Sequence, residues 1–173
     1  MELGLTFPLQ RFLKMKAPDY GTQTDRRFCW DLHVIDLRGR KCLLVVHCHS
    51  RYAFVRYDAM PFQWADIPAL FHIGLTDSLT AAGFPAARIE EYLGQAGEPY
   101  ATRTHGRREV AFLNRVWEDV LALDLWLDTS CQAQPLLDYS VNVRPGRCVG
   151  FEGLGTGLKR IAWTLGAETA AAL

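Results

Sequence analysis

The chain has 173 residues, of which 49% are apolar and 22% charged, and its 19 basic and 19 acidic residues balance to a formal net charge of zero. This length can bury a substantial core, so we expect residues 1–173 to form a single domain. A neutral chain has no general attraction for nucleic acid, which is therefore not expected as a partner. No apolar run approaches the roughly 20 residues that span a membrane, and the first residues do not resemble a signal peptide. We expect a cytoplasmic protein.

The predicted elements begin with strands and continue with helices. We predict a strand at residues 1–7, then a helical turn at 8–14, a polar loop at 15–26 and three further strands at 28–37, 41–47 and 52–57. Helices are predicted at 63–83, from Pro85 to about residue 93, at 107–127 and at 157–165, with a strand or extended segment at 136–143, another extended segment at 147–151 and a frayed tail at 166–173. Short connections between successive strands indicate an antiparallel meander. The predicted fold class is therefore α+β, an antiparallel sheet meander covered on one face by helices.

Five cysteines, at positions 29, 42, 48, 131 and 148, form no Cys-x-x-Cys pair. Their odd number and wide spacing argue against both a disulfide framework and a zinc ribbon. We interpret Cys42 and Cys148, which lie in apolar runs, as small core residues.

The stretch "KCLLVVHCHSRYAFV" ends a predicted strand in a polar cluster. If the preceding turn is centred at Gly39, the paired residue numbers sum to about 78, so Trp30 shares an apolar face with Leu44 and Val46. The other face then holds Asp31 opposite His47. His33 lies one pair further along the strands on this face, and His49 lies near Cys29. We expect Trp30 and Trp117 to share the core on the apolar face.

This polar face leaves three interpretations open. Asp31 and His47 are candidates for an acid/base pair, in which the carboxylate raises the histidine pKa. His33, His47 and His49 are candidate ligands for a divalent metal. The third interpretation is a solvated sheet face without chemistry. We predict a binding pocket formed by Asp31, His33, His47, Arg51 and Asn114, and we predict no cofactor.

Asn114 enters this pocket because it interrupts the apolar stripe of the long predicted helix. We expect its amide to be buried, either bonded to backbone or reaching the pocket.

Two further segments have weaker signals. Arg103, Arg107 and Arg108 gather at the start of that helix, where positive charge opposes the helix dipole, and we interpret them as a solvated loop. The glycine-rich segment 150–160 precedes a helix but matches no phosphate-loop spacing, so we interpret it as the approach to a helix capped by Thr156.

Several motifs of the chain resemble an uncharacterised bacterial family, a domain of unknown function. The family pattern is a Trp-His-x-Asn strand, a Lys-Cys turn, an apolar run ending in Asn, then Thr-Arg-Tyr, a single Asn on a helix and an Asn-x-x-Pro ending. The matching residues are Trp30, Lys41, Cys42, Arg51, Tyr52, Asn114, Asn142 and Pro145. Where the family has His, Asn and Asn, this chain has Asp31, His33 and His47. The resemblance implies kinship of fold and supplies no activity.

The sequence thus predicts a small binding or accessory domain with a polar pocket on its sheet, whose partner is an unidentified small molecule or protein. The alternative is a metal-dependent or acid/base hydrolase-type enzyme that uses Asp31, His33, His47 and His49.

Overall fold

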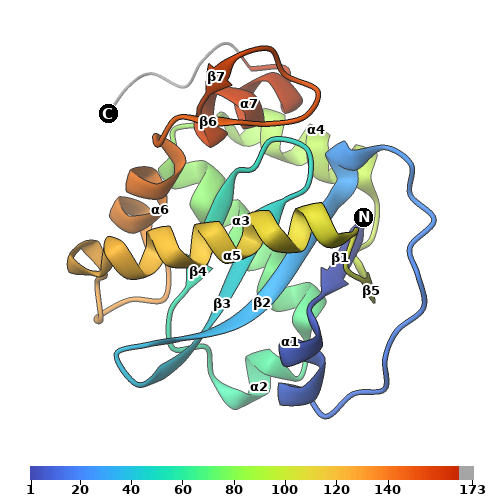
Figure 1. The fold of residues 1–173 in the computed structure, drawn as a ribbon, viewed down its shortest axis with the longest axis vertical. Coiled ribbons are helices and arrows are strands. Elements are labelled where there is room, and N and C mark those ends of the chain that lie inside the picture. The colour runs from blue at the N-terminus through green and yellow to red at the C-terminus, as the bar shows by residue number, and fades with distance from the viewer. Residues whose placement is uncertain (168–173) are drawn as a thin grey trace.

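The computed structural model describes residues 1–167 as a mixed β-sheet between two layers of helices (Figure 1). The five-stranded sheet has the order β4-β3-β2-β1-β5. Its strands are β1 (Glu2–Leu5), β2 (Cys29–Leu37), β3 (Arg40–His47), β4 (Ala53–Arg56) and β5 (Tyr100–Arg103). A small second sheet pairs β6 (Gly146–Arg147) with β7 (Leu154–Gly155). The predicted tail falls largely on residues 168–173, which lie outside the described part of the chain.

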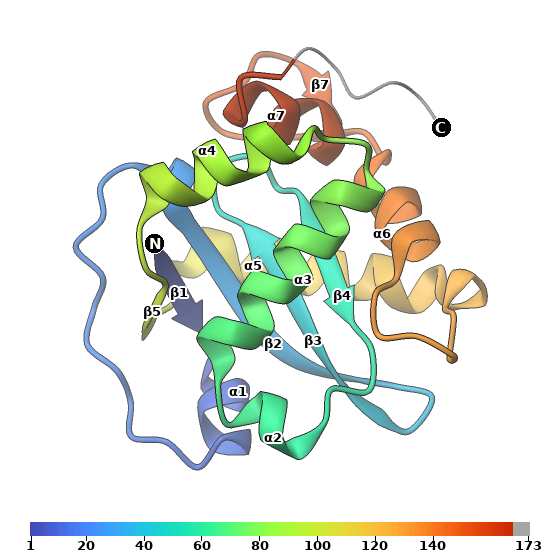
Figure 2. The same cartoon turned by 180° about the vertical axis from the view of Figure 1, so that it is seen from behind.

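The helices occupy both sides of the sheet. They are α1 (Phe7–Phe12), α2 (Pro61–Trp64), α3 (Ile67–Ala81), α4 (Ala86–Ala96), α5 (Arg107–Ala122), α6 (Pro135–Asn142) and α7 (Gly157–Thr164), with short 3₁₀ turns at Arg26–Phe28 and Asp124–Trp126. Helix α5 crosses one face (Figure 1), and α3 and α4 cross the other (Figure 2). The α+β class is confirmed, but the prediction of helices on one face is wrong.

The sheet is mixed rather than antiparallel. Strands β2, β3 and β4 form the predicted antiparallel meander, but β1 runs parallel to both β2 and β5. Strand β5 lies between the predicted helix that ends at about residue 93 and the one that begins at residue 107, where we predicted no strand. A parallel pairing joins residues far apart in the sequence, so no short-range turn signal announces it.

Two separate cores lie on the two faces. Trp30, Leu32 and Val45 pack with α3 and α4 on one face, while Ile35, Leu44 and Val46 pack with α5 and α6 on the other. Both faces are apolar because helices cover both. Trp30 and Trp117 therefore lie on opposite sides of the sheet, not in the shared core that we predicted.

The free edge of β4 is covered by side chains of helix α6. The Asn142 amide accepts from the Ala53 N–H (2.8 Å) and donates to the Ala53 carbonyl (2.6 Å), and Asp138 Oδ1 accepts from the Val55 N–H (2.9 Å). These contacts replace a sixth strand and protect the edge from pairing with another chain. The segment predicted as extended at 136–143 is thus a helix, and its Asn has a structural role.

Within residues 1–167 no helix is both long and apolar enough to cross a membrane. The predicted Thr156 cap is confirmed, since its side chain accepts from the Lys159 N–H at the start of α7.

Candidate functional site

The hairpin between β2 and β3 sets the positions of the predicted site residues. Arg38 and Gly39 both have positive φ (48° and 77°) and form a two-residue turn, so Leu37 pairs with Arg40. Paired residue numbers therefore sum to 77, not 78. This one-residue difference exchanges the two faces of β3. Asp31 pairs with Val46, whereas His47 pairs with Trp30 on the opposite face.

His47 is a neutral, structural residue in the core. Its Nε2–H donates to the Arg27 carbonyl (2.9 Å), and its Nδ1 accepts from the hydroxyl of Ser50 (2.7 Å). Burial lowers the His47 pKa to about 3, the reverse of the predicted increase. Asp31 and His47 are not neighbours, so they do not form the expected acid/base pair.

The other predicted residues are also dispersed. His33 lies on the Asp31 face with its Nδ1 2.8 Å from Thr6 Oγ1, and burial lowers its pKa. His49 packs between Phe151 and Trp163 beyond the end of β3. Asn114 is exposed on α5, contrary to the buried position we predicted. His33, His47 and His49 therefore do not converge on a metal site, and the predicted five-residue pocket does not exist as one cavity.

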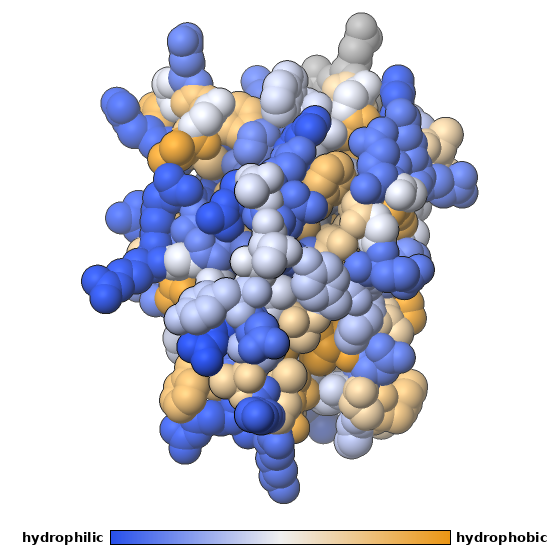
Figure 3. All heavy atoms as spheres, turned by 90° about the vertical axis from the view of Figure 1, so that its right-hand side faces the viewer, coloured by the Kyte–Doolittle hydropathy of each residue, from blue (hydrophilic) through white to orange (hydrophobic). Residues whose placement is uncertain are grey.

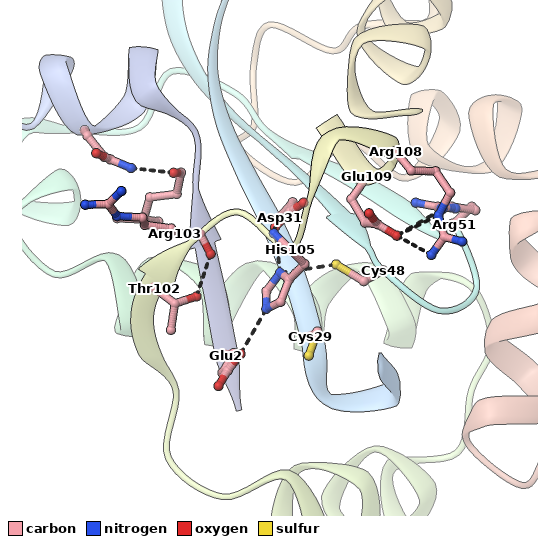
Figure 4. A network of polar contacts seen from close by, with 12 residues as sticks. Glu2, Cys29, Asp31, Cys48, Arg51, Thr102, Arg103, His105, Arg108 and Glu109 are labelled. Atoms are coloured by element: carbon pink, nitrogen blue, oxygen red, sulfur yellow. Dashed lines mark hydrogen bonds and ion pairs between the residues drawn. The ribbon is translucent and has the colours of Figure 1, made fainter. Parts of the chain in front are cut away.

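The side chain that Asp31 does contact is His105, in the loop before α5 (Figure 4). His105 Nδ1 lies 2.7 Å from Asp31 Oδ1, and its Nε2 lies 3.1 Å from Glu2 Oε2. Cys48 Sγ is 3.4 Å from the same Nδ1. We call Glu2, Cys29, Asp31, Cys48 and His105 the buried histidine network.

The parallel strands explain why these residues meet. In the β1–β2 register Glu2 is beside Cys29 and Gly4 is beside Asp31, so all four share one face. A Cβ on Gly4 would lie 2.1 Å from Asp31 Oδ1 and 2.9 Å from His105 Nδ1. Only glycine leaves room for the imidazole above β1. The right-hand side of Figure 1, where β5 and the loop that follows α1 lie, is largely hydrophilic with separate apolar patches (Figure 3).

Both carboxylates of the network stabilise a protonated imidazole. Burial lowers the His105 pKa, but the hydrogen bonds with Asp31, Cys29 and Cys48 outweigh burial and raise it above its usual value. Burial likewise raises the pKa of Glu2, but hydrogen bonds from Gln23, Tyr100, Thr22 and His105 hold it below its usual range. Burial raises the Cys48 pKa to about 12.

A second polar feature is a cavity of about 230 Å³ between α5, α6 and α7, which we call the arginine pocket. Five arginines and one aspartate line it, for a formal charge of +4 in a chain that is neutral overall. The lining residues used below are Arg51, Phe112, Arg115, Asp119, Arg144, Arg147, Gly157 and Arg160. A larger hollow of about 570 Å³ lies beside Met1, α3 and α4, but its lining gathers no such excess of one charge.

Arg51 is the most constrained of these arginines. It follows the β3–β4 turn with a φ of 67°, and only 6% of its surface is exposed. Its guanidinium stacks on Phe112 at 4.7 Å, and Nη2 lies 3.6 Å from Glu109 Oε1. Glu109 is shared with Arg108, at 2.6 Å (Figure 4). Arg51 Nη1 is buried and has no hydrogen-bond partner, which is costly for a charged donor.

Arg160 is also buried, with 5% of its surface exposed, and forms no ion pair within residues 1–167. Its guanidinium donates to the Gly146 carbonyl and lies 5.4 Å from the Phe151 ring. Neither contact supplies negative charge. Buried arginines are usually paired with an anion. Arg160 has no such partner and Arg51 shares Glu109 with Arg108, so both lack a sufficient counter-charge.

Sequence analysis named Arg51 of the arginine pocket and Asp31 of the buried histidine network as site residues but missed the other members of both features. The pocket arginines come from four separate segments, and only Arg144 and Arg147 are close in the sequence, so no local run of charge exists to detect. His105 stands in the basic segment that we interpreted as a solvated loop, and its carboxylate partners depend on the parallel pairing of β1. The only local signal was Asp-x-His in β2, whose first residue does contact a histidine, although not the predicted one.

Together these features define an α+β domain with a strongly cationic cavity and a separate buried network. A family model described as a domain of unknown function (DUF6933) matches residues 2–145, and the chain belongs to this family. The membership confirms the resemblance to an uncharacterised domain family. No curated protein matches the chain.

Proposed function

We propose that this protein is a binding domain for a small phosphate-bearing molecule, which it holds in the arginine pocket. The observation that carries the proposal is Arg51, a buried arginine whose Nη1 has no partner and which lines a cavity together with four further arginines. An anion in the cavity would supply the missing acceptor and balance the charge.

The surroundings of the pocket favour a phosphate group over a carboxylate. A phosphate dianion offers more acceptor oxygens and more charge than a carboxylate, and planar guanidinium groups bind it with paired hydrogen bonds. Gly157, the first residue of α7, also lines the pocket, so the positive end of that helix dipole adds to the field.

The size of the cavity indicates a small ligand. About 230 Å³ is below the range of roughly 300–1,000 Å³ for drug-sized ligands. It accommodates a phosphate with a short substituent. Phe112 supplies the apolar wall and holds Arg51 by stacking.

The lining supports binding rather than catalysis. Asp119 is the one carboxylate that lines the pocket, and it is ion-paired with Arg144. A general base needs to be available to the substrate, and this carboxylate is already engaged by an arginine. We therefore propose a binding or accessory role and no hydrolytic reaction.

Titration calorimetry at constant ionic strength tests this function, with inorganic phosphate as the probe. The variant Arg115→Ala/Arg147→Ala removes two exposed arginines of the pocket, and neither makes an ion pair within residues 1–167, so the fold should be preserved. Charge-assisted hydrogen bonds contribute roughly 1.5–3 kcal/mol each, so we expect phosphate to bind the variant at least tenfold more weakly. The control Arg11→Ala/Arg107→Ala removes the same charge from exposed positions outside the pocket.

Three results would contradict the proposal. They are no saturable binding of phosphate by the native protein, an equal loss of affinity in the control variant, and tighter binding of acetate than of phosphate. An oligonucleotide that binds more tightly than phosphate, with affinity dependent on Arg107, would instead identify a nucleic-acid surface.

A further inference from the structure

The buried histidine network contains a carboxylate oxygen without a partner. Asp31 Oδ1 accepts from the backbone N–H of His105 (3.2 Å) and from its Nδ1 (2.7 Å), but Asp31 Oδ2 is buried and unpaired. An oxygen of Asp31, Cys48 Sγ and a ring nitrogen of His105 all lie within 4.8 Å of one another. Three donors of different chemistry thus converge beside an unsatisfied oxygen.

The burial of the network also favours a bound cation. Glu2 and Asp31 are both 1% exposed, and Asp31 keeps one buried oxygen without a partner. Buried negative charge of this kind is normally paired or bound to a metal.

We propose that Asp31, Cys48 and Nδ1 of His105 bind a zinc ion. Thiolate, imidazole and carboxylate are the three ligand types that zinc takes in proteins. Cys48 Sγ and His105 Nδ1 are 3.4 Å apart, which is close to the separation of two donors bound to one tetrahedral zinc. The site differs from the three candidate histidine ligands named from the sequence, and it is independent of the arginine pocket.

Glu2 completes this arrangement from the other side of the ring. Nε2 of His105 lies 3.1 Å from Glu2 Oε2, and Glu2 Oε1 is fixed by the backbone N–H groups of Thr22 (2.6 Å) and Gln23 (2.7 Å). A metal-bound histidine commonly donates its second N–H to a carboxylate, which orients the ring and strengthens its bond to the metal. Glu2 is therefore a positioning residue.

Zinc binding is balanced by the release of two protons. One leaves the Cys48 thiol and one leaves Nδ1 of His105, while Nε2 keeps its proton for Glu2. The zinc ion brings two positive charges and the two released protons remove two, so the net charge of the buried network does not change. This exchange predicts that zinc affinity increases with pH.

A second trio, Glu2, Cys29 and Nε2 of His105, has the same ligand types. Every oxygen of Glu2 already has a hydrogen-bond partner, whereas Asp31 Oδ2 has none. The unsatisfied oxygen therefore assigns the metal to the Asp31 side of the ring, and Cys29 serves to separate the two possibilities experimentally.

The test uses untagged protein kept reduced and expressed with zinc or with cobalt. We expect about one equivalent of zinc by elemental analysis, and cobalt-loaded protein should show thiolate-to-cobalt charge-transfer bands and the visible bands of a tetrahedral site. Cys48→Ser should abolish the charge-transfer bands, while Cys29→Ser and Cys131→Ser should keep them. Competition with a zinc chelator should show a 10- to 100-fold weaker affinity for Glu2→Gln, as expected for an outer partner of a ligand.

Circular dichroism confirms whether each variant is folded before its metal content is compared. Folded native protein without bound zinc and without cobalt bands would overturn the proposal. Loss of the bands in Cys29→Ser with retention in Cys48→Ser would also overturn it, because the metal would then lie on the Glu2 side.

Discussion

The imidazole of His47 packs against the indole of Trp30, with ring centroids 4.3 Å apart, in the core beneath α3 and α4. The two residues are cross-strand partners, which fixes the register of the central hairpin. This contact separates His47 from Asp31 and leaves Asp31 free to bind His105 on the other face.

A neutral buried histidine makes the free energy of unfolding decrease as the pH falls. The His47 pKa is about 3 in the folded chain, below its usual value of about 6.5. The unfolded chain therefore binds more protons between these values, so stability is fully present above about pH 6.5 and is lost as the pH falls toward 3. We expect His47→Gln to reduce this loss by up to about 1.4 kcal/mol per pH unit, measured as urea midpoints between pH 4.5 and 7.5. His33 contributes in the same direction and remains in both proteins. Parallel pH curves for the two proteins would contradict the neutral His47.

Asp138 should have the opposite effect at higher pH. Burial raises its pKa to about 8, although bonds from Val55 and Ser78 and the charge of Arg56 oppose the increase. The folded chain then holds a proton that the unfolded chain loses, so stability falls as the pH rises from about 4 through 8. In Asp138→Asn the side-chain oxygen can still accept from the Val55 N–H, but the side chain cannot ionise. We expect it to flatten the denaturation midpoint between pH 5 and 9, and an unchanged slope would show that Asp138 is ionised in the fold.

Gly4 should be irreplaceable for a steric reason. Its Cβ in Gly4→Ala would meet Asp31 Oδ1 at 2.1 Å and His105 Nδ1 at 2.9 Å. We expect a destabilisation of roughly 1–3 kcal/mol from overpacking, together with an NMR shift of the His105 ring. Gly94→Ala is the matched control, because its Cβ meets nothing within 4 Å and it lies inside α4. The control should gain up to about 1 kcal/mol in helix propensity. Equal effects of the two substitutions would argue against a close-packed network.

Substitutions at a buried and at an exposed position should differ in their cost to stability. Trp30 is fully buried and donates to the Tyr92 hydroxyl (3.0 Å), so Trp30→Ala should cost about 3–5 kcal/mol. Asn114 is exposed, so Asn114→Leu should change stability by no more than about 0.5 kcal/mol. Chemical denaturation measures both, and a large cost for Asn114→Leu would support the buried position expected from the sequence.

Local patterns in the sequence identified most elements but not their assembly. The α+β class, the three-strand meander and the Thr156 cap follow from alternation and capping, which act over a few residues. The predicted register was wrong because we centred the turn on Gly39. The actual turn consists of two residues, Arg38 and Gly39, and both have positive φ. The prediction that Asn114 is buried was wrong because the buried stripe of α5 runs through Leu113, Val116 and Val120, one step around the helix.

The candidate sites depend on contacts that no short segment contains. Glu2 and His105 are 103 positions apart and meet only because β1 and β5 pair. The arginine pocket closes when α7 packs over the turn at Arg51, where Gly157 allows a close approach to the Arg51 carbonyl. Such long-range packing is set by the whole fold, so charge patterning along the chain does not reveal it.

The central claim is that Arg51 and Arg160 hold a phosphate group in the arginine pocket. NMR of the arginine side-chain N–H groups tests it most directly, with signals assigned from Arg→Lys variants and inorganic phosphate added at constant ionic strength. The account predicts saturable shifts of the Arg51 and Arg160 signals, with slowed rotation of the Arg51 guanidinium, while the exposed Arg107 does not respond. Shifts confined to exposed arginines such as Arg107, with Arg51 and Arg160 unchanged at saturating phosphate, would contradict it.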